Sequence, residues 1–135
     1  MIRLSRLTDY AVALLSHMGK GREGRLWAAS ELAETSGLPM PTVAKVLKLL
    51  AKQDLVAAQR GAMGGYRLMR PALAISVAAI IEAMDGPIAL THCANGESHE
   101  ICDVRKICPV GVGWGKVNHA IRKALTDVSL AELGG

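Results

Sequence analysis

The chain has 135 residues, the length of one compact domain, and a formal net charge of +4 at pH 7. Half of the residues are apolar but none is Phe, which favours a core of packed helices over a sheet sandwich. No apolar run has the length of a membrane span, and the first residues lack the pattern of a signal peptide, so we expect a cytoplasmic protein without membrane contact.

The charge is distributed unevenly along the chain. Residues 1–70 contain eleven Lys or Arg and five Asp or Glu, whereas residues 71–135 contain five and seven. A basic front half beside a mildly acidic back half suggests that the front half meets a polyanion. Because an ordinary solvated surface could show the same imbalance, the positions of the charges must decide.

The front half begins with the pattern of helices joined by short connections. Apolar spacing predicts helices over about 4–19 and 29–35, with a very short strand at 26–27 between them. A third helix opens near Pro41, because the first helical turn does not use the N–H that proline lacks.

The connection between the second and third helices fits a helix-turn-helix. This motif needs a small residue where the helices cross, a positive φ angle four residues later, and apolar side chains six and nine residues beyond that. The matching residues are Ala33, Gly37, Val43 and Val46. A plain helical hairpin could carry the same four residues, so the segment that follows is needed to decide.

That segment is a basic β-hairpin, formed by extended runs at 56–59 and 66–69 around a glycine-rich tip. A helix-turn-helix followed by such a wing predicts binding to duplex DNA, with the third helix in the major groove and the wing at phosphates or the minor groove. Lys45 is the strongest candidate for a base contact. The predicted DNA-binding residues are Thr42, Lys45, Lys48, Arg60, Gly64, Gly65, Tyr66 and Arg67.

The back half predicts two more helices. Ser76 caps the first, which ends near 85–87, and a long helix over about 110–126 has apolar residues at three- and four-residue intervals. So small a chain offers that stripe no other partner, which predicts a homodimer. The expected fold is mainly α with a small β-hairpin wing: a winged helix-turn-helix in residues 1–72 and a cluster-binding loop with a dimerisation helix in residues 73–135, in one compact unit.

Three cysteines, Cys93, Cys102 and Cys108, lie within sixteen residues between those two helices. Zinc fingers and thioredoxin-like pairs use closer spacings, and an odd number does not suit a disulfide framework. Wide spacing in one loop can hold an iron–sulfur cluster, whose irons accept thiolates from several directions. Zinc is the alternative, whereas simple buried thiols do not fit a loop rich in Gly, Asn and charge.

Three thiolates leave one coordination position for another ligand. His92 and His99 are close in sequence, and Asp9 or a residue of a partner chain could also supply it. A ligand other than a thiolate makes a cluster more exchangeable, which suits a sensor. Asp9 could instead be a first-turn carboxylate favoured by the helix dipole. Two-iron and four-iron clusters are both compatible with this ligand set.

Several segments, spread over nearly the whole chain, carry a family resemblance. They are residues 4–11, 31–39, 60–68, 75–83, the three cysteines and residues 128–133. With these segments the chain resembles the Rrf-type winged-helix iron–sulfur regulators, which include IscR-, NsrR- and SufR-like proteins. Residues 82–91 and the opening segment make the regulators of the Suf cluster-assembly operon the nearest likeness.

The resemblance implies a homodimer on a palindromic operator, whose promoter affinity changes with the state of the cluster. The predicted function is a transcription regulator, a repressor of Suf genes, and not an enzyme, because the sequence offers no nucleophile–base constellation. The alternatives are a nitric-oxide or redox sensor on the same scaffold and a zinc-stabilised module without regulated DNA binding.

Two departures from the family pattern affect the predicted ligands. The first cysteine interval is longer than that of IscR- and NsrR-like members, and Gly111 stands where IscR-like members have a ligand histidine. The histidine scheme is therefore not carried over. Asp9 matches the acidic residue that NsrR-like members donate from the other subunit, which makes it the preferred fourth ligand, followed by His92 or His99.

Overall fold

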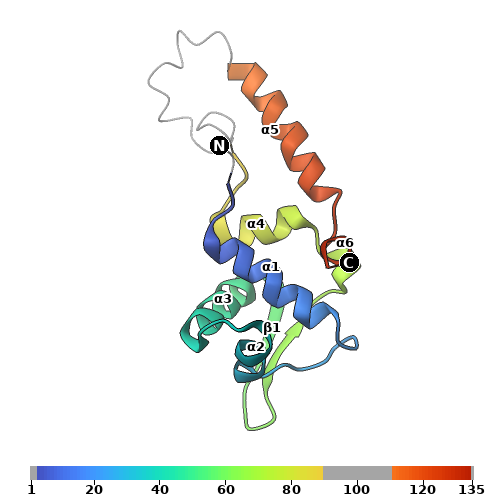
Figure 1. The fold of residues 1–135 in the computed structure, drawn as a ribbon. Helices are drawn as coiled ribbons and strands as arrows, with labels where there is room; N and C mark the ends of the chain where they lie inside the picture. Colours follow the sequence, from blue (N-terminus) through green and yellow to red (C-terminus); the bar gives the residue numbers. More distant parts are fainter. Residues whose placement is uncertain (1–2, 90–110, 135) are drawn as a thin grey trace.

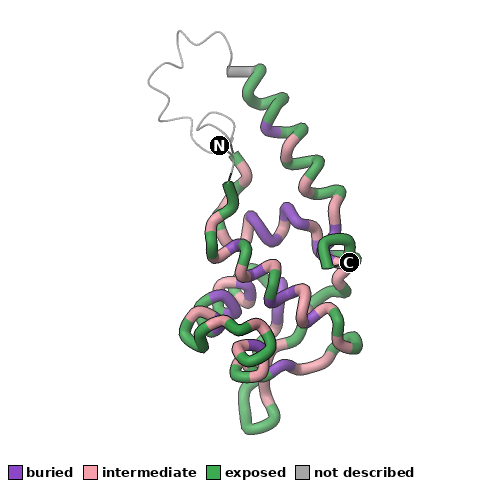
Figure 2. Tube along the Cα trace, viewed as in Figure 1, coloured by how far each residue is buried: buried purple, intermediate pink, exposed green. Residues whose placement is uncertain are grey.

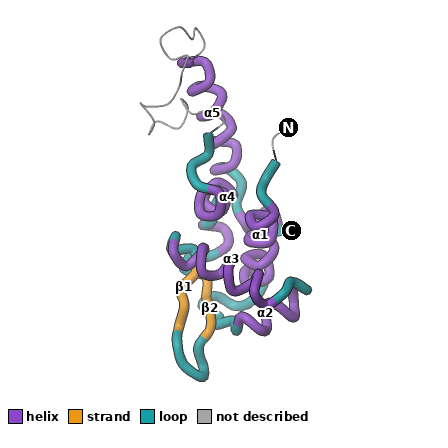
Figure 3. Tube along the Cα trace, turned by 90° about the vertical axis from the view of Figure 1, so that its left-hand side faces the viewer, coloured by secondary structure: helices purple, strands orange, loops and turns teal. Residues whose placement is uncertain are grey.

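The computed structural model describes residues 3–89 and 111–134 of the chain (Figure 1). The described elements are mostly helical, and a two-stranded antiparallel hairpin projects from one end, as Figure 3 shows in orange. The expected fold class is thus confirmed. Within the described part of the chain, no helix is long and apolar enough to span a membrane. In chain order the elements are α1 (Arg6–Gly19), α2 (Ala29–Ser36), α3 (Met40–Lys52), β1 (Val56–Gln59), β2 (Gly65–Leu68), the 3-10 helix η1 (Ala72–Ala74), α4 (Val77–Asp85), α5 (Gly111–Thr126) and α6 (Leu130–Leu133).

Helix α1 begins at Arg6, two residues later than predicted, because Ser5 is its N-cap. The Ser5 side chain accepts a hydrogen bond of 3.1 Å from the backbone N–H of Thr8, which satisfies one of the donors that a helix start leaves free. Leu4 lies before the cap and is 45% exposed. The apolar side of α1 faces inward with Ala11, Leu14, Leu15 and Met18.

A single aliphatic core joins the front and back halves of the chain. Figure 2 shows the buried residues along α1, α3 and α4, where the helices face one another. Trp27 is the aromatic residue among the buried side chains of this core, and Tyr10 and Tyr66 pack against it half-buried. The large side chains that are completely buried include Leu14, Leu15, Leu32, Val43, Val46, Leu47, Leu50, Ile75 and Ile80.

The helix-turn-helix forms as its four signature residues predict. Gly37 ends α2 with φ +76°, and its N–H donates a hydrogen bond of 2.9 Å to the carbonyl of Ala33. That left-handed conformation is one that a residue with a Cβ adopts only at a cost. Val43 and Val46 of α3 are completely buried.

The predicted wing is the antiparallel pair β1–β2, whose register runs from Val56↔Leu68 to Gln59↔Gly65. Strand β2 begins at Gly65, one residue earlier than predicted. The short strand expected at 26–27 is a single β-bridge in which Trp27 and Tyr66 exchange backbone hydrogen bonds of 2.7 and 2.8 Å. The bridge connects β2 to the segment before α2, so β2 lies between β1 and Trp27.

The back half contains the Ser76-capped helix α4 and the long helix α5 in the predicted places. The short helix α6 was not predicted. Its N-cap is Ser129, and backbone hydrogen bonds on either side of that residue join Val128 to Val77 (2.9 Å) and Leu130 to Ile75 (2.8 Å). Leu130 is only 1% exposed, so the end of the chain completes the core beside α1 and η1.

Candidate nucleic-acid interface

Helix α3 separates an apolar face from a cationic one. Its inward face carries Val43, Val46, Leu47 and Leu50, all completely buried. Lysines at three- and four-residue intervals share the opposite side of the helix. These exposed residues are Lys45, Lys48 and Lys52. Thr42, one turn before Lys45, is half-buried.

The cations of α3 and the wing are not neutralised by the ion pairs found within residues 3–89 and 111–134. Helix α3 itself contains no Asp or Glu. The ion pairs in those ranges are Arg25–Glu31, Arg122–Glu82 and Lys123–Asp127. Lys45 and Lys48, together with Arg60 and Arg67 of the wing, are therefore available to an external anion such as a phosphate.

The wing carries its predicted cations in exposed positions. Arg67 lies opposite Ala57 in the strand register, and Arg60 begins the tip. Gly65 has a local structural reason to be glycine, because a Cβ built on it would lie 2.5 Å from the carbonyl oxygen of Trp27. A Cβ on Gly64 would overlap the carbonyl oxygen of Gln59. A role of these two glycines at DNA stays a prediction.

A contact that the sequence analysis missed joins Arg25, in the loop before α2, to Trp27 of the same loop and to Glu31 in the first turn of α2. The guanidinium carbon of Arg25 lies 3.5 Å from the centre of the Trp27 ring, and Arg25 Nη2 forms an ion pair of 2.6 Å with Glu31 Oε2. Arg25 and Trp27 are two residues apart, and alternate residues of an extended segment point to the same side. That alternation could have predicted the contact between Arg25 and Trp27 from the sequence.

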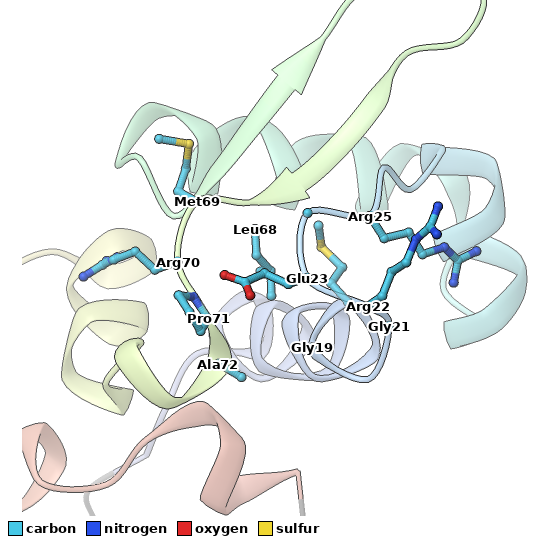
Figure 4. A pocket seen from close by; sticks show the side chains of 12 residues that line it. Gly19, Gly21, Arg22, Glu23, Arg25, Leu68, Met69, Arg70, Pro71 and Ala72 are labelled. Carbon is cyan, nitrogen blue, oxygen red and sulfur yellow. The ribbon is translucent and has the colours of Figure 1, made fainter.

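A cavity of about 160 Å³ lies where the wing leaves the core. Figure 4 shows one wall formed by residues 69–72 after β2 and another by residues 21–25 of the loop after α1. Met18 and Leu68 contribute apolar surface, while Arg22, Glu23 and Arg70 bring charge. Beside this cavity the wing is attached by the bridge between Trp27 and Tyr66 and by the backbone hydrogen bond from Met69 to the carbonyl of Leu55.

The second predicted site falls largely outside the described residues. Cys93, Cys102, Cys108, His92 and His99 all lie there. Within the described ranges, no group of three or more His, Cys, Asp or Glu side chains is placed to hold a metal ion.

Asp9, the preferred fourth ligand, is exposed in the first turn of α1. The preceding residue, Thr8, is completely buried, and its hydroxyl donates a hydrogen bond of 2.6 Å to Asp85 Oδ2 at the end of α4. Burial, the largest influence, raises the pKa of Asp85, but hydrogen bonds from the Thr8 and Ser5 side chains and the Ser5 backbone hold that pKa below its ordinary value of 3.8. Asp9 is thus next to a fixed contact between α1 and α4.

Helix α5 is attached to α4 and to the residues that follow it. Asn118, which is 7% exposed, donates a hydrogen bond of 2.9 Å from Nδ2 to the carbonyl of Ile88. Arg122 Nε donates one of 2.8 Å to Glu82 Oε1, and this hydrogen bond and the Glu82 charge raise the pKa of Arg122. The later turns of α5 are therefore fixed to α4 and to the segment that follows it.

A helix-turn-helix followed by a hairpin, with exposed cations on both, defines a winged-helix regulator. The chain matches the model of the Rrf2 family, described as an iron-dependent transcriptional regulator, over residues 4–134, and it belongs to that family. The expected Rrf-type resemblance is confirmed. The protein is accordingly a transcription regulator of this family.

Solved structures of similar fold support the architecture. CymR, the global cysteine regulator of B. subtilis, has 24% identity and a TM-score of 0.73, with 99% of this chain and 97% of that chain covered. IscR of T. potens has 24% identity and a TM-score of 0.67, with 98% and 85% covered. CymR of Staphylococcus aureus has 26% identity and a TM-score of 0.65, with 96% of both chains covered. The likeness to Suf regulators stays a prediction.

Proposed function

We propose that this regulator is a homodimer that acts in the cytoplasm, binds a palindromic operator through α3 and the wing, and responds to an iron–sulfur cluster held by its cysteines. The observation that carries the DNA-binding part is the division of α3 into a buried apolar face and an exposed face whose lysines have no acidic neighbour on the helix. In Figure 1, the wing and α3 lie at the end of the molecule opposite to the start of α5.

In this proposal each predicted DNA-binding residue has a distinct role. Lys45 and Thr42 face base edges in the major groove, and Lys48 neutralises phosphates beside them. Arg60 and Arg67 meet phosphates or the minor groove from the wing. Gly64, Gly65 and Tyr66 would contribute to DNA binding through their backbone, which can approach the DNA closely. The hairpin and its bridge to Trp27 hold that backbone in place.

A salt titration tests the DNA-binding part. We expect the logarithm of operator affinity to fall linearly with the logarithm of salt concentration, with a slope of about −0.9 for each phosphate neutralised. Replacing Lys48 or Arg60 with Ala should weaken binding and make the slope shallower by about that amount. Lys116→Ala is the matched control, because Lys116 is also exposed but lies on α5. If both test variants bind the operator as the wild type does, the proposed binding by α3 and the wing is wrong.

The ligand chemistry supports the cluster part. Thiolates suit iron–sulfur clusters, and Cys93, Cys102 and Cys108 would hold the cluster with Asp9, or else His92 or His99, as the fourth ligand. When bound, the cluster would supply a labile inorganic centre whose loss or oxidation changes the local charge and the chain path. The family description, iron-dependent transcriptional regulator, agrees with this choice of metal.

A contiguous set of contacts supports the coupling of the cysteine segment to the DNA-binding end. Asn118 and Arg122 hold α5 to Ile88 and α4, and Asp85 holds α4 to Thr8 of α1. Helices α1 and α4 share the core with α3. Regulation additionally requires that the cluster stabilise one arrangement of these elements over another.

Anaerobic purification tests the cluster part. We expect a coloured protein with iron and acid-labile sulfide, and Cys102→Ala should abolish the visible absorption while helical content is kept. Asp9→Ala should change the absorption or speed cluster loss, whereas Glu34→Ala, an equally exposed helical carboxylate, should not. Stoichiometric zinc in a colourless protein would instead support the zinc-stabilised module.

A redox-sensing role is the second candidate, together with direct reaction with nitric oxide. One observation favours it: the oxidised form of S. aureus CymR has 25% identity to this chain and a TM-score of 0.67. Exposure of the anaerobic protein to each oxidant, followed by operator binding, separates this role from sensing of cluster supply. For the target genes we propose repression of Suf cluster-assembly genes, tested by transcript levels in a deletion strain.

A further inference from the structure

The tip of the wing is a closed turn that presents two apolar residues. It lies between the register pair Gln59↔Gly65. Gly61 has φ +110°. The N–H of Gly64 donates a hydrogen bond of 3.0 Å to the carbonyl of Gly61. Because a Cβ on Gly64 would overlap Gln59, the chain is as tightly folded there as glycine allows. Ala62 and Met63 form the centre of the turn.

Met63 is unusually exposed for its size and chemistry. Its 86% exposure exceeds that of every other large hydrophobic residue in the part of the chain that the structure describes. Residues 60–63 of the tip are exposed (Figure 2), and Arg60 places a cation three residues before Met63. A single exposed apolar side chain is common on protein surfaces, so its place, at the end of a projecting basic hairpin, is what matters.

We propose that Met63 is an apolar minor-groove contact of the wing. The inference rests on the proposed DNA-binding function and adds Met63 to the predicted DNA-binding residues. A narrow turn can enter the minor groove, where apolar side chains contact sugars and base edges or press between base steps. Methionine suits this role because its unbranched thioether adapts to irregular surfaces. Arg60 supplies the electrostatic attraction at the same place.

This assignment predicts a specific thermodynamic signature. A phosphate contact releases counterions and so depends on salt, whereas burial of an apolar side chain does not. Loss of Met63 should therefore lower affinity equally at all salt concentrations. Loss of Arg60 should also make the salt slope shallower.

The test uses the full chain and a fluorescent duplex selected from a randomised pool with the wild-type protein. Met63→Gln, which keeps the length but adds a polar amide, should weaken binding about tenfold, the effect of leaving part of a methionine side chain unburied, with an unchanged salt slope. Met63→Leu should bind within about twofold of the wild type. Leu73, which is 78% exposed and lies outside the wing, provides the matched control Leu73→Gln, which should have no effect.

A modified base localises the contact. Replacing adenine with 2,6-diaminopurine adds an amino group in the minor groove only. When the modified base lies in the stretch that faces the wing, it should lower the affinity of the wild type more than that of Met63→Gln. If Met63→Gln binds as the wild type does, or if it changes the salt slope as Arg60→Ala does, the inference is overturned while the proposed function stands. If the wild type selects no duplex at all, both are overturned.

Discussion

Thr8 Oγ1 and Asp85 Oδ2 are joined by a hydrogen bond of 2.6 Å between residues 77 positions apart in the chain. The bond connects the first turn of α1, which carries Asp9, to the last residue of α4, after which the chain leads toward the cysteines. Because Thr8 is completely buried, the position of the donor hydroxyl in this hydrogen bond is fixed by the surrounding core. The hydrogen bond joins the front half of the chain to the end of α4, which precedes the segment that contains the cysteines.

The Asp85 carboxylate should make stability depend on acidic pH. Because the folded-state pKa is held below 3.8, ionisation of Asp85 stabilises the folded chain above that value, and the stabilisation is lost as the pH falls through 3.8 and then through the lower folded pKa. The effect is small, about 1 kcal/mol or less, because the side chain is largely exposed. Urea unfolding should give a wild-type minus Asp85→Asn difference that is constant at neutral pH and shrinks below about pH 4. A difference that grows on acidification would contradict this.

Thr8→Val should destabilise the fold by about 1 kcal/mol at neutral pH, since it keeps the shape and removes the hydroxyl donor. Thr35→Val, on an exposed site of α2, is the control and should change little. Thr8→Val also removes the acceptor of a 3.0 Å hydrogen bond from Ser5 Oγ. In the double variant Thr8→Val with Asp85→Asn, the two effects should not fully add, because both substitutions remove the Thr8–Asp85 hydrogen bond. Full additivity would mean that the hydrogen bond contributes nothing.

The helix-turn-helix and the cationic face of α3 could be predicted from the sequence, because each depends on residues close together in the chain. Ala33, Gly37, Val43 and Val46 lie within a short stretch, and helical periodicity alone places them at the turn and in the core. The cationic face of α3 follows from the same periodicity, since the lysines occupy positions that the apolar stripe leaves free.

Contacts between distant segments could not be predicted in this way. Helix α6 exists because Leu130 enters a core built by α1 and η1, and its backbone bonds to Ile75, which no local pattern reveals. The partner of Thr8 was equally hidden, because Asp85 next to Gly86 indicates only the end of a helix. Ser129 with Glu132 three residues later did offer a local signal, that of a helix N-cap.

Arg25 should contribute to stability through the Trp27 ring as well as through Glu31. Both members of the ion pair are more than one-third exposed, so the pair and the ring contact together are worth about 1 kcal/mol. Arg25→Ala should lower the thermal midpoint and shift Trp fluorescence, while Arg25→Lys should keep part of the stability. Arg22→Ala, in the same exposed loop, is the control. If Glu31→Ala removes as much stability as Arg25→Ala does, the ring contact contributes nothing.

Gly65→Ala should break the bridge that holds the wing to the segment before α2. The new Cβ would lie 2.5 Å from the Trp27 carbonyl oxygen and 2.9 Å from its carbon, so the strand must move, at a cost of about 1–3 kcal/mol. Gly115→Ala is the opposite case, because a Cβ there meets nothing within 4 Å and alanine favours a helix by up to about 1 kcal/mol. Denaturant unfolding compares the two, and hydrogen exchange at the Trp27 and Tyr66 amides locates the damage. Normal amide protection in Gly65→Ala would contradict the assignment.

The exposed apolar face of α5 should be the homodimer contact. Trp114 and Val117 are 41% and 44% exposed, and Ile121 and Leu125 continue the same face at helical spacing. Val117→Glu would bury an unpaired carboxylate in that contact and should raise the dimer Kd about a hundredfold, equivalent to about 3 kcal/mol.

Lys116→Glu is the matched control for this substitution, since it introduces the same side chain at the adjacent, exposed position of α5. Sedimentation equilibrium measures the dimer Kd, and operator affinity should fall together with dimerisation because two linked half-site contacts become one. A Val117→Glu protein that remains as dimeric as Lys116→Glu would place the dimer contact on another surface of the chain.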